Sequence, residues 1–154
     1  EVVELAQRAA DDASSVLLTD LDDSVPPVPV DYDGVHQVLL NLITNAIDAV
    51  GRTSGIINVR THFDQQRRGV VLSVRDNGPG VPPDQQKRIF EPFQSTKGHG
   101  GTGLGLAVAR KIIREMNGTI TLVTPPDGGA EFRVFLPAAQ PETRSASDTL
   151  GPPT

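Results

Sequence analysis

Apolar side chains recur along the chain in two patterns, and each pattern predicts a type of element. Spacings of three and four residues predict helices over 1–13, from about Asp31 to Gly51, and over 104–116. We expect Asp31 or Asp33 to cap the second helix and Gly51 to end it. One stripe of that helix is apolar and consists of Val35, Val38, Leu39, Leu42, Ile43, Ala46 and Ile47.

Shorter apolar runs, bounded by Gly, Pro and polar residues, predict strands at 16–19, 56–62, 70–75, 120–124 and 131–136. A polar turn joins the second and third runs, and a turn rich in Pro and Gly joins the last two. Both pairs are therefore expected to form hairpins. Paired strands among three long helices favour an α/β fold, namely a two-layer α/β sandwich in which a mixed sheet is covered on one face by the three helices.

The length of the chain, 154 residues, leaves room for one ordinary domain, which we expect to span residues 1–137. A hydrophobic fraction of 37% is sufficient for a buried core. Residues 138–154 hold several Pro, Ser and Thr but a single Leu. Such a segment cannot offset its ordering entropy, so we expect a disordered tail.

Composition argues against several classes of function. A net charge of −5 disfavours a nucleic-acid partner, which normally requires a basic patch. The absence of Cys excludes disulfides, thiolate metal sites and cysteine nucleophiles. No apolar run is long enough to cross a bilayer, and the acidic start is unlike a signal peptide. We therefore expect a cytoplasmic module without direct membrane contact; a longer protein that contained it could still be anchored in a membrane.

Two asparagines interrupt the apolar stripe of the second predicted helix. Asn41, Asn45 and Asp48 follow one another at spacings of four and three residues, so they share a face. Asn is unfavourable inside a helix because its side chain competes for backbone hydrogen bonds, and each one therefore needs a partner. Either the pair bonds to neighbouring loops at the edge of the core, or it supplies oxygen ligands for Mg²⁺ and donors for phosphate.

A kinked loop, Asp76-Asn77-Gly78-Pro79-Gly80, directly follows the predicted strand 70–75. An Asp-Asn-Gly turn can serve a hairpin with no ligand at all. Pro79 and Gly80 add a second tight bend, however. The loop could therefore hold the Asp76 carboxylate in a pocket, with its backbone packed against a flat ligand.

A glycine-rich segment, 98–105, runs directly into the third predicted helix. Backbone amides at a helix N-terminus, freed of side chains by Gly, form an anion site. The dinucleotide-binding fingerprint is excluded because a convincing strand does not precede the segment, and a Walker loop would end in Gly-Lys-Ser/Thr. A flexible hinge loop is the alternative.

The order of these segments resembles the catalytic, ATP-binding domain of bacterial sensor histidine kinases, in the superfamily that also holds gyrase, Hsp90 and MutL ATPases. The resemblance covers about 30–137 and implies the Bergerat ATP-binding fold. Its motifs are an N box at 36–49, a first glycine box at 76–81, an F box at 89–93 and a second glycine box at 101–107.

The resemblance implies that these boxes bind ATP and Mg²⁺. Asn45 is expected to coordinate Mg²⁺ on the triphosphate with Asn41 beside it, both as catalytic residues, and Asp76 to accept a hydrogen bond from the adenine amine. The expected ATP-binding set is completed by Asp48, Gly78, Gly80, Val81, Ile89, Phe90, Gly101, Thr102, Gly103, Leu104, Gly105 and Leu106.

The segment 91–102 corresponds to the ATP lid of the family, and we expect it to be mobile without nucleotide. Lys97 is the only Lys within it and is the candidate catalytic contact to the terminal phosphate. The alternative for Lys97 is a surface side chain without a partner. The run Ser95-Thr96-Lys97 resembles the nitrogen-sensor type of histidine kinase.

One position departs from the hydrolysing branches of the superfamily, which carry a Glu where this chain has Asn41. An amide cannot take a proton from water, so transfer of the phosphoryl group to a separate acceptor is favoured. Residues 1–30 contain no His. The resemblance thus implies an acceptor His on a helical dimerisation domain of the same parent kinase, with residues 1–13 as the end of a linker, and a response regulator reached through that parent.

Three functions remain open on these residues. The first is the histidine kinase catalytic domain of two-component signal transduction. The second is another enzyme, either a serine-directed kinase of the anti-sigma type or a stand-alone ATPase. The third is a non-catalytic module that senses ATP. The complete boxes count against the third, because a relative that has lost activity often loses the Asn or the glycines.

Overall fold

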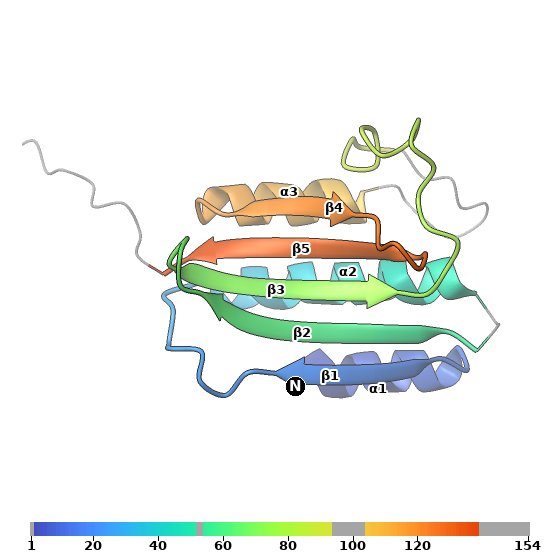
Figure 1. Ribbon diagram of the computed structural model, residues 1–154, viewed down its shortest axis with the longest axis horizontal. Coiled ribbons are helices and arrows are strands. Elements are labelled where there is room, and N and C mark those ends of the chain that lie inside the picture. Colours follow the sequence, from blue (N-terminus) through green and yellow to red (C-terminus); the bar gives the residue numbers. More distant parts are fainter. Residues whose placement is uncertain (1, 52–53, 94–103, 139–154) are drawn as a thin grey trace, which may run out of the picture.

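The computed structural model describes residues 2–51, 54–93 and 104–138, and within them the chain forms three helices and five strands (Figure 1). The helices are α1 (Val2–Asp12), α2 (Tyr32–Val50) and α3 (Gly105–Glu115). The strands are β1 (Val16–Leu21), β2 (Ile56–Asp64), β3 (Gly69–Asp76), β4 (Thr119–Val123) and β5 (Ala130–Pro137). Every helix and strand predicted from the sequence is present.

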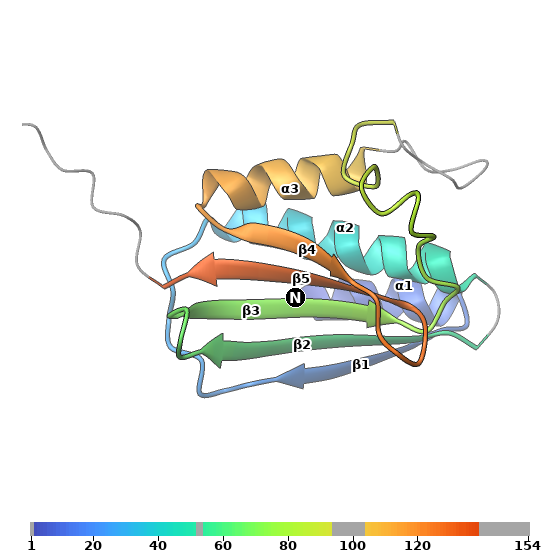
Figure 2. The same cartoon turned by 45° about the horizontal axis from the view of Figure 1, so that its top comes forward.

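The strands form a single five-stranded sheet in the order β1-β2-β3-β5-β4. β1 lies parallel to β2, and the other neighbouring strands are antiparallel. All three helices lie on one face of this sheet, and the other face is open (Figure 2). The expected two-layer α/β sandwich with a mixed sheet is therefore confirmed.

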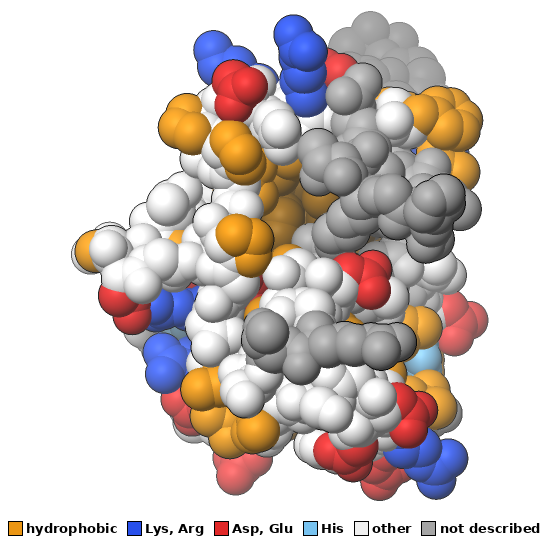
Figure 3. All heavy atoms as spheres, turned by 90° about the vertical axis from the view of Figure 1, so that its right-hand side faces the viewer, with side chains coloured by type: hydrophobic (Ala, Val, Ile, Leu, Met, Phe, Trp, Pro, Cys, Tyr) orange, Lys and Arg blue, Asp and Glu red, His pale blue; other side chains and the backbone are white. Residues whose placement is uncertain are grey.

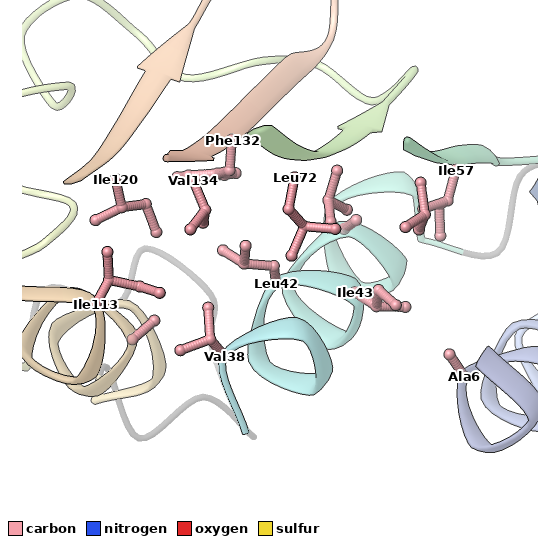
Figure 4. Packing of buried hydrophobic residues seen from close by; sticks show 14 of the residues in the cluster. Ala6, Val38, Leu42, Ile43, Ile57, Leu72, Ile113, Ile120, Phe132 and Val134 are labelled. Carbon is pink, nitrogen blue, oxygen red and sulfur yellow. The ribbon is translucent and has the colours of Figure 1, made fainter. Parts of the chain in front are cut away.

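The core lies between the sheet and α2. Alternate strand residues, among them Ile57, Leu72 and Val134, point toward the helices and are almost fully buried. Leu42 of α2 points between these strands and α3, where Ile113 completes the layer (Figure 4). Val, Leu, Ile and Ala make up most of this core, as the low aromatic content of the sequence predicts.

The ends of the helices follow the predicted signals with one exception. Gly51 ends α2 with a φ of +63°, and its N–H donates to the carbonyl of Ile47 at 3.2 Å. Asn117, also with a positive φ, follows the last turn of α3. Asp31 occupies the N-cap position of α2, but its carboxylate makes no capping hydrogen bond. The N-cap position was therefore predicted correctly, but the expected capping hydrogen bond is absent.

Among the described residues, every helix is too short or too polar to cross a bilayer. The predicted tail lies outside the described residues apart from Ala138, whose N–H donates to the carbonyl of Arg68 at 2.9 Å. This bond holds the chain beside the turn between β2 and β3 just after β5 ends.

Candidate functional site

Three of the predicted motifs meet at one end of the molecule. β3 ends there at Asp76, α3 begins there at Gly105, and α2 runs between them (Figure 1). Seen from that end, the surface is hollowed, and hydrophobic side chains line the inside of the hollow (Figure 3). α2 is the shared wall of the site, because it contacts the loop after β3 near Ala49 and the start of α3 at Asn41. These two contacts lie about 12 Å apart along the helix.

Asp76 is the last residue of β3 and is only 2% exposed. A buried carboxylate is costly unless hydrogen bonds satisfy it. The backbone N–H of Gly78 donates to Asp76 Oδ1 at 2.9 Å, which closes a tight turn and fixes the orientation of the carboxylate. The predicted placement of Asp76 in a pocket at the end of a strand is consistent with this burial.

Asn77 fastens the same loop to the neighbouring strand. Its side-chain oxygen accepts a hydrogen bond from the N–H of Ile56 at 2.8 Å, and its own N–H donates to the carbonyl of Ile56 at 3.2 Å. No role for this side chain was predicted from the sequence. The available signal was an Asn directly after a strand, where its amide can continue the pairing of the sheet.

Two glycines of the loop allow close contacts between backbones. A Cβ on Gly78 would lie 2.9 Å from the carbonyl oxygen of Ala49 on α2. Gly80 has a φ of +77°, and a Cβ there would lie 2.9 Å from the carbonyl oxygen of Gly129. The loop is therefore held against the protein on both sides. The predicted contact of these glycines with a flat ligand remains a prediction.

Asn41 is half-buried and joins two helices. Its Nδ2 donates to the carbonyl oxygen of Gly105, the first residue of α3, at 3.1 Å. The partner that a helical Asn needs is thus present for Asn41, as the first of the two interpretations requires. Asn45 is half-buried one turn further along α2, and Asp48 is exposed.

The apolar residues predicted for the site divide between its rim and the core. Phe90 is 9% exposed and packs edge-to-face on Phe132, with ring centroids 6.0 Å apart. The guanidinium of Arg110 lies 5.5 Å from the centre of the Phe90 ring. The other apolar residues that were predicted for the site and are described in the structure are partly buried, namely Val81, Ile89, Leu104 and Leu106.

A groove of about 390 Å³ runs along α3. It is lined by Phe90, Pro92, Ala107, Arg110, Lys111, Arg114 and Glu115. Its floor is apolar and most of its charged side chains are basic. Phe90 thus separates the core from this groove.

Several predicted residues lie outside the described part of the chain, namely Lys97, Gly101, Thr102 and Gly103 together with residues 94–102 of the lid. Among the described residues, His, Cys, Asp and Glu form no group of three that could hold a metal ion. The amide of Asn41 lies beside α3, and that of Asn45 lies one turn further along α2. Amide oxygens are suitable ligands for Mg²⁺, which commonly completes its shell with water and phosphate oxygens.

Known proteins share both the sequence pattern and the fold of this chain. A sequence model of the family described as histidine kinase-, DNA gyrase B-, and HSP90-like ATPase matches residues 30–140. The sensory histidine kinase/phosphatase NtrB of Salmonella typhimurium is 41% identical over 129 residues, which cover 79% of this chain and 36% of that protein. NtrB of Rhodobacter capsulatus is 39% identical over 156 residues, covering 92% of this chain and 43% of the relative.

A solved structure shares the fold. The catalytic domain of histidine kinase ThkA, in a nucleotide-free form, superposes with a TM-score of 0.79 at 31% sequence identity, and the match covers 89% of this chain and 88% of that domain. The chain therefore matches an isolated catalytic domain almost from end to end, whereas it spans only 36% and 43% of the two NtrB proteins.

Proposed function

The chain belongs to the histidine kinase-, DNA gyrase B- and HSP90-like ATPase family, and on that premise we propose that it is the ATP-binding catalytic domain of a sensor histidine kinase. It binds ATP with Mg²⁺ and donates the terminal phosphate to a histidine on a separate helical domain. The observation that carries the proposal is the joint attachment to α2 of the loop that bears buried Asp76 and of the N-terminus of α3.

The base side of the site, residues 76–81, recognises adenine in this proposal. The Asp76 carboxylate, oriented by the N–H of Gly78, accepts a hydrogen bond from the exocyclic amine of the base. Guanine presents a carbonyl oxygen at the corresponding position. Two acceptors would then face each other in a buried site, so ATP is preferred over GTP.

The phosphate side of the site consists of Asn41, Asn45 and the N-terminus of α3. The first amides of a helix have no partner within the helix and attract anions, so those at the start of α3 would meet the triphosphate. Asn45 would hold Mg²⁺ through its side-chain oxygen. When bound, Mg²⁺ offsets the negative charge of the phosphates. Asn41 keeps α3 at the correct distance by its bond to Gly105.

The transfer itself requires little chemistry from this chain beyond positioning. A ring nitrogen of the acceptor histidine attacks the terminal phosphorus. The bond between that phosphorus and the β–γ bridging oxygen breaks, and ADP leaves with the electron pair. The other ring nitrogen of the acceptor gives up its proton to solvent. The residues of this chain hold the triphosphate in line for the attack.

Water is a poor competitor for the phosphoryl group at this site. Asn41 stands where hydrolysing relatives are expected to carry a Glu, and its amide donates to the Gly105 carbonyl. A general base is worth about 10²–10⁴ in rate, and an amide cannot act as one. Turnover of ATP by the domain alone should therefore stay far below about 1 s⁻¹.

The partners of this site follow from the acceptor chemistry. We propose that the acceptor histidine belongs to the dimerisation domain of the same parent kinase and that a response regulator receives the phosphate from it. We further propose that the domain acts in the cytoplasm, where ATP is available. Nucleic acid has no part in this function.

A transfer assay tests the proposal. The chain, ATP labelled on its terminal phosphate and Mg²⁺ are mixed with helical hairpin domains that carry one histidine, and with the same hairpins in which glutamine replaces it. We expect acid-labile, alkali-stable label on the hairpin only when the histidine is present. Asn45→Ala should prevent labelling, and Thr44→Ala, at an exposed neighbouring position on α2, should not.

Each other outcome of the assay would indicate a different function for this chain. Acid-stable label on a serine residue would show that the chain acts as a serine kinase and not as a histidine kinase. Release of phosphate to water at about 1 s⁻¹ or faster would identify an ATPase. ATP binding without transfer to any hairpin would favour an ATP-sensing module.

A further inference from the structure

The turn between β4 and β5, residues 124–129, lies against the base side of the site. We propose that this turn is a positioning element that sets the place of the Asp76 carboxylate, and with it the preference for adenine. Gly129, the last residue of the turn, makes the contact on which the inference rests. The inference rests on the proposed function, because it assigns to the turn a part in ATP recognition, which the turn would exert through the loop that bears Asp76.

The contact between Gly129 and Asp76 is made by backbone. A Cβ on Gly129 would lie 2.0 Å from the carbonyl oxygen of Asp76 and 3.2 Å from the Cα of Asn77. The same glycine faces Gly80, because its carbonyl oxygen would lie 2.9 Å from a Cβ there. Gly129 thus lies close to the first and the fifth residues of the loop, and a side chain at position 129 would collide with the backbone of Asp76 unless the loop or the turn shifted.

Side chains on both flanks hold the turn in this position. Asp127 forms an ion pair with Arg75, which directly precedes Asp76. Gln86 donates through Nε2 to the carbonyl of Val81 at 3.0 Å and to Thr124 Oγ1 at 3.3 Å. The turn is therefore connected to Arg75, just before the loop, and through Gln86 to Val81, just after it.

A shift of the turn would act on recognition through geometry. The hydrogen bond from an adenine amine requires the Asp76 oxygen at a defined place, and that place depends on the backbone of residues 76–78. Displacements of about 1 Å in such a supporting element are enough to lower activity strongly. Gly129 is therefore a positioning residue whose replacement should change base selection as well as affinity.

The chain offers a matched control in the neighbouring glycine. Gly128 and Gly129 both have a positive φ, +99° and +80°, so Ala is strained at either position. A Cβ on Gly128 meets nothing within 4 Å, whereas one on Gly129 meets Asp76. Comparison of Gly129→Ala with Gly128→Ala therefore isolates the contact from the strain.

Two measurements test the inference. Calorimetric titration with ATP and GTP should give for Gly129→Ala an affinity for ATP about tenfold lower and a reduced ratio of ATP to GTP affinity, while Gly128→Ala keeps the ratio of the unmodified protein. Amide exchange without nucleotide should be faster at Gly78 in Gly129→Ala only, because that amide is bonded to Asp76. The second measurement does not depend on ATP.

The outcomes separate the inference from the proposed function. If the unmodified chain binds no ATP, the proposed function fails, and the exchange rate of Gly78 still shows whether the turn positions the loop. Equal affinity ratios and equal exchange in the two variants would overturn the inference. If Gly129→Ala does not fold by circular dichroism, Asp127→Ala takes its place. Its carboxylate is exposed, and unchanged Gly78 exchange in that variant would also overturn the inference.

Discussion

The base side of the candidate site is packed backbone against backbone and supported by side chains around it, whereas the contact described on the phosphate side is made by one side chain. On the base side, Gly78 and Gly80 lie so close to α2 and to the β4–β5 turn that neither position has room for a Cβ. On the phosphate side, α2 and α3 meet through the bond from half-buried Asn41 to Gly105, and a Cβ on Gly105 would have its nearest neighbour 4.0 Å away.

This difference indicates separate roles for the two sides. On the proposed function, a close-packed loop with a buried carboxylate would be in its binding geometry before the ligand arrives, which favours selection of one base. A helix terminus that the described residues leave loosely packed can adjust as a charged triphosphate enters and leaves. The comparison predicts that changes on the phosphate side alter metal-dependent affinity and that changes on the base side alter selectivity.

The largest effect is expected from Asn45→Ala. Loss of the side-chain oxygen should remove the dependence of ATP affinity on Mg²⁺, at least by the roughly 10- to 100-fold that changes near a metal ligand cost. Calorimetric titration of ATP with and without Mg²⁺ measures this dependence, and exposed Thr44→Ala is the control. An unchanged Mg²⁺ dependence in Asn45→Ala would remove Asn45 from the metal site.

Asp76→Asn should have the next largest effect. It should change the selection of the base and leave the dependence of affinity on Mg²⁺ unchanged. An amide presents both a donor and an acceptor, so it can face guanine as well as adenine. We expect the ratio of ATP to GTP affinity to fall about tenfold, in line with the value of a hydrogen bond to a charged group. Exposed Asp84→Asn is the control. A preserved ratio in Asp76→Asn would contradict the division between the two sides.

Asn41→Ala should mainly loosen the junction between α2 and α3. The bond from Nδ2 to the Gly105 carbonyl would be lost, and the free energy of unfolding should fall by about 1 kcal/mol. ATP affinity should fall, but the ratio of ATP to GTP affinity should not change. Urea unfolding and titration of both nucleotides measure the two quantities. A change in base selection would show that the sides are not independent.

The smallest effect is expected at Ser15, which directly precedes β1 and belongs to neither side of the site. Its hydroxyl is buried and has no hydrogen-bond partner among the described residues. Ser15→Ala should therefore raise the free energy of unfolding by up to about 1 kcal/mol, because a buried polar group without a partner is removed. Thermal unfolding tests this, and nucleotide affinity should stay the same. A lower melting temperature would show that the hydroxyl has a stabilising contact.

The sequence predicted the elements well because their signals are local. The apolar stripe of α2 repeats every three or four residues, and Gly51 ends the helix through its own backbone conformation. Both hairpins have turns that short runs of polar residues, Gly or Pro specify. The pairing of β3 with β5 joins segments far apart in sequence, and no local pattern specifies it. For the same reason the contact of Gly129 with Asp76 could not be predicted. Glycines in a hairpin turn satisfy local rules whatever packs against them.

The same distinction applies to the site. Burial of Asp76 at the end of a strand was expected from the loop that follows it, and the structure has it. The partner of Asn41 was required by helix chemistry, but its identity, the Gly105 carbonyl, depends on how α3 packs on α2. The roles of Asn77, Gln86 and Asp127 depend on three-dimensional neighbours. Side chains that support a loop from other elements leave little trace in the sequence.

The most direct test of the central claim is a calorimetric titration of the unmodified protein with ATP and then with GTP, both in the presence of Mg²⁺. A preorganised base side built around buried Asp76 predicts binding of ATP with at least about tenfold higher affinity than GTP. Equal affinity for the two nucleotides, or no binding of ATP, would contradict it.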